Sequence, residues 1–325
     1  MKKVFEEFKI RQTFIKNRLV VPPMVNFNIS DESGLIKDEQ IAHYQKLAAG
    51  GFGLIVVEAC SIGELGKLHK SQIGLYNNQQ IFNHQRLVNA IHYYDCVAIL
   101  QIQSSGIFAV DDDLKAPSAY MIETKSRIRA AKAYTKEELD ELKEQFIQCG
   151  IRAYKCGYEG IELHGCHNYL ISQLYNKNIN QRNDEYSVDK ISGHLIDIIK
   201  KIRSNTNDKF IVGIRLGAYE PNLSDGINHA QELVDDVDYI SVSTGFSYGH
   251  NVEVDVNFPY NEYIYGAYMI KKYINKPVFA VNEINTFDKV LSVLKDCDVD
   301  GICIGRQALV NPNFGNDMLE YIKEK

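Results

Sequence analysis

The stretch FGLIVVEA (residues 52–59) decides the fold class, because it is a short apolar run without polar alternation. A strand of this type is buried on both faces, as in a parallel sheet covered by helices. Seven similar runs occur along the chain: RLVVPPM (18–24), CVAILQI (96–102), YEGIELH (158–164), FIVGIRL (210–216), DYISVST (238–244), KPVFAVN (276–282) and DGICIGR (300–306). Eight parallel strands are the number that closes a barrel.

Amphipathic stretches of helical length separate most of these runs, and several begin with a capping residue. They predict helices over 38–51, 79–94, 135–157, 188–205, 227–237, 262–274 and 286–297. TKEE (135–138) matches a capping box, and 103–134 is a long non-periodic insertion whose length is typical of a functional loop. The alternation of strands and helices, without an internal repeat or a linker, predicts one α/β domain over 1–325, a (β/α)8 TIM barrel.

A doubly wound sheet is the main alternative fold. If it bound a nucleotide, it would carry a GxGxxG or GxxxxGK[ST] loop after its first strand, and neither string occurs here. The strand count and this absence favour the barrel.

Composition limits the partners and the compartment. The 325 residues carry a formal charge of −6, and the 36 basic residues are dispersed, which argues against nucleic acid as a partner. No stretch reads as a signal peptide or a membrane span, so we expect a cytoplasmic protein with a small-molecule substrate. The 7 cysteines lack CxxC spacing and predict reduced packing residues. The composition leaves open whether the chain is a monomer or a homo-oligomer.

In a barrel of this type the active site lies at the carboxyl ends of the strands. Arg215 is costly to bury there unless it faces an electron-rich group, with an internal ion pair to Glu58 or Glu162 as the alternative. The loops AVNEINTF (280–287) and IGRQAL (304–309) predict a phosphate site, where Gly305 allows close backbone approach and Arg306 supplies a bidentate contact.

The stretch IELHGCHNYL (161–170) places two imidazoles and a phenol at the end of the fourth run. His164 and His167 can donate two hydrogen bonds to one substrate oxygen, and Tyr169 can deliver a proton to carbon. This chemistry suits the reduction of an activated double bond. A structural histidine pair with a packing tyrosine is the alternative, and a metal held by the histidines is a second one.

These residues make the chain resemble the old yellow enzyme family, the FMN-dependent ene-reductases that use NADH or NADPH. The matching segments cover nearly the whole chain: NRLVVPPM (17–24), IAHYQKLAAGGFGLIVVEA (41–59), LQIQSSG (100–106), IELHGCHNYLISQLYNKNINQRNDEY (161–186), GIRL (213–216) and GICIGRQALVNPNF (301–314). The resemblance implies an FMN oxidoreductase that takes hydride from NADH or NADPH and reduces an α,β-unsaturated carbonyl or a similar acceptor.

The resemblance also implies a role for each candidate residue. His164 and His167 would bind the substrate oxygen, Tyr169 would act as the acid, and Phe27 would face the substrate. The residues expected to contact FMN are Pro22, Pro23, Met24, Val25, Ala59, Gln101, Arg215, Asn282, Gly305 and Arg306.

Several positions depart from the family pattern. Val25 stands where relatives carry Cys or Thr, Ser104 where a histidine is usual, and SVDKISGHL follows Tyr186 in place of the family signature. Glu283 puts a carboxylate near the expected phosphate. These departures leave two alternatives open: an FMN-binding barrel with weak or lost ene-reductase activity, and another flavin barrel such as a dihydrouridine synthase.

Overall fold

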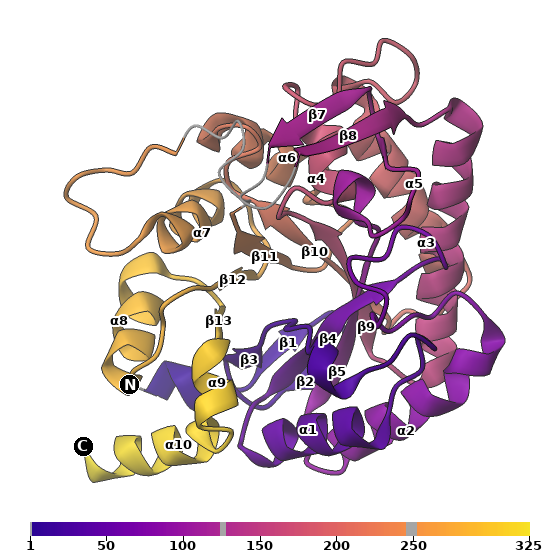
Figure 1. Cartoon of the computed structure of the whole chain (residues 1–325). Coiled ribbons are helices and arrows are strands. Elements are labelled where there is room, and N and C mark those ends of the chain that lie inside the picture. Colours follow the sequence, from indigo (N-terminus) through magenta and orange to yellow (C-terminus); the bar gives the residue numbers. More distant parts are fainter. Residues whose placement is uncertain (1, 124–127, 245–251) are drawn as a thin grey trace.

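The computed structural model describes residues 2–123, 128–244 and 252–325, and its centre is a closed barrel of eight parallel strands (Figure 1). The strands are β3 (Leu19–Val21), β4 (Leu54–Ser61), β5 (Val97–Gln103), β9 (Gly160–Gly165), β10 (Ile211–Gly217), β11 (Ile240–Ser243), β12 (Val278–Ala280) and β13 (Gly301–Cys303). Their order around the barrel is β10-β11-β12-β13-β3-β4-β5-β9. Each of the eight apolar runs forms one strand, so the predicted TIM barrel is confirmed.

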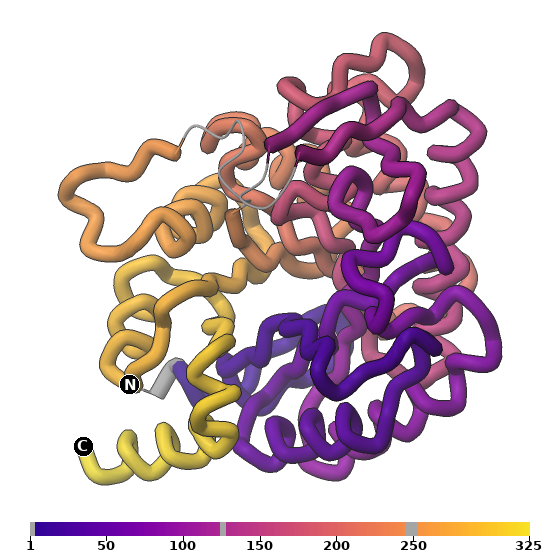
Figure 2. Tube along the Cα trace, in the orientation of Figure 1, coloured from indigo at the N-terminus to yellow at the C-terminus, as the bar shows by residue number. Residues whose placement is uncertain are grey.

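Closure of the barrel brings together strands from the two ends of the sequence. Strand β13 pairs with β3 in parallel, so the last strand of the barrel lies beside the first. Figure 2 shows this seam where the yellow and indigo parts of the tube meet.

The seven predicted helices surround the barrel (Figure 1). They are α1 (Asp38–Ala49), α2 (Ile81–His92), α3 (Lys136–Cys156), α5 (Ile191–Ser204), α6 (Leu223–Leu233), α7 (Glu262–Tyr273) and α8 (Phe287–Cys297). The predicted capping box at the start of α3 is present, since Thr135 Oγ1 accepts from the Glu138 amide and Glu138 accepts from the Thr135 amide. Helix α6 begins four residues earlier than predicted, because the side chain of Asn222 caps it.

The structure contains elements that the periodicity did not predict. The insertion after β5, which the sequence indicated as a long non-periodic loop, holds a small sheet of β6 (Lys115–Ala116), β7 (Tyr120–Glu123) and β8 (Ile128–Ala133). Three further helices are α4 (Leu170–Tyr175), α9 (Arg306–Val310) and α10 (Phe314–Glu324). Short 3-10 helices span Lys2–Phe5, Phe27–Ile29, Asn78–Gln80, Gly106–Phe108 and Val188–Lys190.

An N-terminal hairpin of β1 (Phe8–Ile10) and β2 (Thr13–Ile15) closes the amino end of the barrel. Ile10 and Ile15 are buried in the same cluster as the inward residues of the strands. Arg11, in the turn, donates to the carbonyl of Asp208 and forms an ion pair with Asp238, which holds the hairpin against the strand starts. This packed interior fixes the strand positions and so the places of the side chains at the opposite, carboxyl end.

The sequence-based expectation about the cysteines is confirmed. All seven cysteines are buried and free, as expected for reduced packing residues. Within the described part of the chain, no helix combines the length and the apolar character that crossing a bilayer requires.

Candidate active site

The mouth of the barrel contains a cavity of about 570 Å³ at the carboxyl ends of the strands. Seven of the predicted cofactor residues line it: Pro22, Pro23, Met24, Arg215, Asn282, Gly305 and Arg306. They come from the loops after β3, β12 and β13 and from β10 itself. The fold therefore gathers into one cavity residues that are separated by up to 284 positions in the chain, from Pro22 to Arg306.

Arg215 is the charged group at the floor of this cavity, and its side chain is buried. Its Nη2 donates to Ser243 Oγ over 3.5 Å, whereas Nε and Nη1 have no oxygen or nitrogen partner among the described residues. The alternative of an internal ion pair is not what the structure shows, because no described carboxylate forms an ion pair with this guanidinium. A buried cation with two unused donors indicates a missing acceptor.

Glu162 lies near Arg215 but is satisfied by neutral donors. Gln101 donates to one carboxylate oxygen at 2.8 Å, and the Tyr239 hydroxyl donates to the other at 3.0 Å. Burial raises the pKa of Glu162, and the positive charge of Arg215 opposes that rise. The negative charge of Glu162 thus interacts with the Arg215 guanidinium without a hydrogen bond, and the Nε and Nη1 donors of Arg215 stay available.

Ser243 connects Arg215 to the predicted histidines through a chain of hydrogen bonds. His167 Nε2 lies 2.9 Å from Ser243 Oγ, and His167 Nδ1 lies 3.1 Å from His164 Nε2. His164 Nδ1 ends the chain, and it is buried without a partner. Strand register explains the proximity, since Arg215 pairs with His164 and lies one strand away from Ser243.

The direction of this chain follows from which groups can donate. Arg215 can only donate, so Ser243 Oγ accepts from it and can pass its own hydrogen to His167 Nε2. His167 Nδ1–H then donates to His164 Nε2, and only His164 Nδ1–H remains unpaired. The opposite direction would leave both the serine hydrogen and a ring lone pair of His164 unsatisfied. In this arrangement the pair offers one N–H donor, whereas the sequence predicted two donors to one oxygen.

The site keeps these groups neutral. Burial, with the charge of Arg215, lowers the pKa of His167 to about 3 and holds the pKa of His164 well below its usual value. Burial raises the pKa of Tyr169, so the phenol carries its proton at neutral pH. Its ring lies 4.9 Å from that of His164, and the described part of the chain forms no hydrogen bond to its hydroxyl.

The loop between β9 and α4 has an uncommon backbone that places Tyr169. His167 and Asn168 have φ values of +61° and +56°, a left-handed conformation that side chains other than glycine adopt at a cost. The side-chain Nε2 of Gln173 donates to the Asn168 carbonyl at 2.5 Å and so holds the turn. The turn brings the phenol back over the histidines.

Seven predicted site residues are not in the cavity lining. Three of them, His164, His167 and Tyr169, lie beside it, where Ser243 links the histidines to Arg215. The other four are Val25, Phe27, Ala59 and Gln101. Ala59 is inside β4, where its carbonyl already accepts from Gln72, and Gln101 is bonded to Glu162. Phe27 stacks on His69 with ring centroids 4.3 Å apart. Val25 is half-buried in the loop after β3.

The far end of the cavity is the predicted phosphate region. Asn282 and Glu283 both have left-handed backbone, with φ of +88° and +54°. Arg306 donates to Asn282 over 3.5 Å, and Glu283 accepts from Asn261 over 3.4 Å. The Glu283 carboxylate lines the cavity and accepts from a neutral amide, so its negative charge stays near the predicted phosphate region.

Two other positions that depart from the family pattern, Ser104 and the segment after Tyr186, are well packed. Ser104 is buried after β5, and its carbonyl accepts from the Leu170 amide. After Tyr186, a 3-10 turn beginning at Val188 leads into α5. The Tyr186 ring stacks on His194 at 4.1 Å and its hydroxyl donates to Asp140 at 2.6 Å. The different sequence there still gives an ordered loop.

The residues that could bind a metal in the alternative interpretation are poor ligands. His164, Cys166 and His167 have ligand atoms within 4.8 Å of one another. Burial raises the pKa of Cys166, which keeps the thiol protonated, whereas a metal ligand must be a thiolate. Two imidazoles that are already bonded to each other complete the set, so these residues suit hydrogen bonding better than coordination.

The comparisons with known proteins identify the family. The family model described as "NADH:flavin oxidoreductase / NADH oxidase family" matches residues 3–324. The chain belongs to this family. The resemblance to old yellow enzymes is thereby confirmed, and FMN is the cofactor of the family.

Individual relatives agree with this assignment. An NADPH dehydrogenase of Listeria innocua is 32% identical over 331 residues, covering 100% of this chain and 96% of its own. An NADPH dehydrogenase of Clostridium acetobutylicum is 29% identical over 325 residues, covering 96% and 93%.

Solved structures support the fold. The old yellow enzyme homologue from Zymomonas mobilis has a TM-score of 0.80 at 20% identity, with 98% and 92% of the two chains covered. A 2-naphthoyl-CoA reductase complex has a TM-score of 0.88 at 22% identity and 98% coverage of this chain, which spans 52% of that longer chain.

The residues of the cavity fit FMN. The two unpartnered donors of Arg215 suit the electron-rich edge of a flavin ring, and Arg306 suits a phosphate. A Cβ added at Gly305 would lie 3.5 Å from Pro22 and 3.6 Å from Met24, so glycine leaves the space between these loops open. The sequence did not assign a role to Ser243, although its inward position follows from the strand period of two after Tyr239 and Ser241.

Proposed function

We propose that this protein is an FMN-dependent oxidoreductase that takes hydride from NADPH and reduces an activated C=C bond, such as that of an α,β-unsaturated carbonyl. The observation that carries the proposal is the set of unused donors around one mouth: two on Arg215, one on His164 and the hydroxyl of Tyr169. The name NADPH dehydrogenase, carried by relatives that match the whole chain, supports NADPH as the donor.

The proposed cofactor contacts follow from the cavity lining. Pro22, Pro23 and Met24 would lie along the ring, and Arg215 would meet its polar edge. Val25, Ala59 and Gln101 are not in the lining, and only the resemblance to the family implies that they approach the ring. Asn282, Gly305 and Arg306 would hold the phosphate. When bound there, FMN would provide the chemistry of hydride transfer from NADPH to the substrate.

The chain's own residues would bind the substrate and move the proton. His164 Nδ1–H would donate to the carbonyl oxygen, which lowers the cost of negative charge developing there. His167 and Ser243 would hold His164 in the tautomer that carries this hydrogen. Tyr169 would protonate the carbon next to the carbonyl, and Phe27 would contact the substrate body.

The visible spectrum of the purified protein tests the proposal. We expect a yellow protein that NADPH bleaches under nitrogen and that cyclohexenone recolours, with one equivalent of product for each flavin. A yellow protein that NADPH bleaches but cyclohexenone does not recolour would show that the proposed acceptor class is wrong. A colourless protein that does not take up FMN would remove the proposal entirely.

A further inference from the structure

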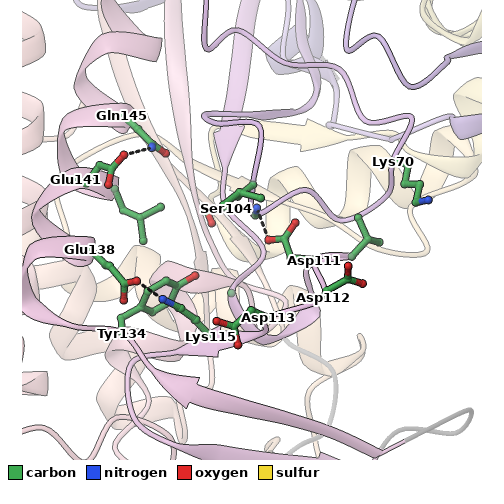
Figure 3. Close-up of a pocket in the computed structure, with 15 residues that line it drawn as sticks. Lys70, Ser104, Asp111, Asp112, Asp113, Lys115, Tyr134, Glu138, Glu141 and Gln145 are labelled. Atoms are coloured by element: carbon green, nitrogen blue, oxygen red, sulfur yellow. Dashed lines mark hydrogen bonds and ion pairs between the residues drawn. The ribbon is translucent and has the colours of Figure 1, made fainter.

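A second cavity, of about 620 Å³, lies outside the barrel mouth between α3 and the loops after β4 and β5 (Figure 3). Its lining shares no residue with the mouth cavity. A volume of this size is typical of small-molecule sites. We name it the α3 trough and define it by Leu65, Ser104, Val110, Asp111, Glu141 and Gln145.

The α3 trough is elongated. A neighbouring cavity of about 590 Å³ shares Leu65, Glu141 and Gln145 with it and continues along α3 to Glu144. Glu138, Glu141 and Glu144 follow one another at intervals of three residues, so they lie along one side of the helix. The shape suits a linear ligand that lies along α3.

The charge of the trough is negative and only partly compensated. Lys115 pairs with Glu138, and Lys132 pairs with Asp113 at 2.8 Å. No ion pair is formed by Asp111, Asp112, Glu141 or Glu144 among the described residues; Glu141 and Glu144 accept only from the neutral amides of Gln145 and Gln148. Lys70, the other cation of the trough lining, lies across the trough from Glu141 (Figure 3), and Arg152 lines the neighbouring cavity beyond Glu144.

A buried polar group also points to a ligand. Ser104 is 2% exposed and lines the trough, and its hydroxyl has no hydrogen-bond partner. A Cβ at Gly66 would lie 2.5 Å from this hydroxyl, so the hydroxyl packs directly against the Gly66 backbone and leaves no room there for a side chain. At the rim, the Leu65 side chain is 74% exposed, which leaves an apolar surface beside the acids.

We infer that the α3 trough binds a linear aliphatic polyamine. Its ammonium groups would pair with Glu141, Glu144 and Asp111, and its methylene segments would pack on Leu65 and Val110. Two residues three positions apart on a helix are separated by about 4.5 Å along the axis, which is close to the distance between two nitrogens joined by three methylenes. The Ser104 hydroxyl would accept from an ammonium group on the floor. This site is independent of the proposed oxidoreductase chemistry.

Calorimetric titration of the flavin-loaded protein with spermidine tests the inference. The compact trication hexaamminecobalt(III) is the control ligand, since it carries the same charge without a chain. We expect spermidine to bind at least about tenfold more tightly than the cobalt complex, and Glu141→Gln with Glu144→Gln to weaken it at least about tenfold. Leu65→Ala should weaken spermidine and leave the cobalt complex unaffected.

Glu137→Gln is the matched control variant, because it removes the same charge from the same helix outside the trough. It should bind spermidine like the wild-type protein, and thermal melts will show that all variants are folded. Equal affinity for the two trications, or equal weakening by Glu137→Gln and Glu141→Gln, would mean simple screening of an acidic surface and would overturn the inference.

Discussion

The Tyr169 ring packs edge-on against the His164 ring, and its hydroxyl is the proposed proton donor. The ring of Tyr169 also packs edge-on against Phe108 with centroids 6.3 Å apart, so Tyr169→Phe keeps the packing and removes only the hydroxyl. We expect recolouring by cyclohexenone to slow by about 100-fold or more, the usual size of an acid's contribution. Bleaching by NADPH should be unchanged, since it needs no proton from this residue. Stopped-flow absorbance measures both steps, and equal slowing of the two would contradict the role.

Ser243 is predicted to position the histidines through its hydroxyl. Ser243→Ala removes the group between Arg215 and His167, so both imidazoles can exchange tautomers and the His164 Nδ1 hydrogen is no longer fixed. We expect KM for cyclohexenone to rise by about tenfold, the cost of one hydrogen bond to a positioned group.

Nitrogen NMR of labelled histidine measures which ring nitrogen is protonated. A purely structural role of Ser243 would leave these tautomers unchanged in the variant. The wild-type protein should show protonated Nδ1 on both His164 and His167, and Ser243→Ala should show mixed forms. Ser243→Thr retains a hydroxyl and should restore both the spectrum and KM. Unchanged tautomers in Ser243→Ala would rule out the positioning role.

At the scale of elements, a buried carboxyl joins β4 to α1. Glu58 accepts from Gln40 at 3.2 Å and from the Tyr44 hydroxyl at 3.4 Å, and its second oxygen has no partner. Burial raises the pKa of Glu58 from 4.5 to about 7. The folded state therefore binds a proton more tightly than the unfolded chain, and stability is lost as pH rises from about 4.5 through about 7.

Glu58→Gln removes this titration while keeping the shape of the side chain. The wild-type protein should lose about 3 kcal/mol relative to the variant between pH 4 and pH 8. Urea unfolding at both pH values measures the difference. Burial also raises the pKa of Glu220 to about 8, but that group is present in both proteins and cancels from the comparison. A constant difference across the range would show that Glu58 does not titrate in the folded state.

At the scale of the whole molecule, the hairpin at the amino end supports the barrel that carries the site. Ile15 is 0% exposed inside the barrel, whereas Ile128 is 64% exposed on the insertion sheet. Ile15→Ala should lower the free energy of unfolding by about 2–5 kcal/mol, and Ile128→Ala should change it little. Chemical denaturation compares them. Similar effects of the two changes would mean that the hairpin does not contribute to the barrel core.

The barrel and its helices were predictable because their signals are local. Each strand is an apolar run such as 52–59, and the capping residues Thr135 and Glu138 lie within one helical turn. The insertion sheet was missed, because strands as short as Lys115–Ala116 carry too little pattern to distinguish them from a loop. Likewise the cavity residues could be named from strand ends, but the partners of Gln101 and Glu283 depend on side chains far away in the chain.

The sequence by itself determined the order of the eight barrel strands and of the seven helices between them, the family, and the strand ends that meet at the carboxyl end of the barrel. Tertiary structure alone decided how those residues pair: that Ser243 lies between Arg215 and His167, that the histidines bond to each other, and that Arg215 keeps two donors unused. The physical reason is that periodicity and caps act over a few residues, whereas hydrogen-bond partners are chosen by distances of about 3 Å between strands that closure of the barrel brings together.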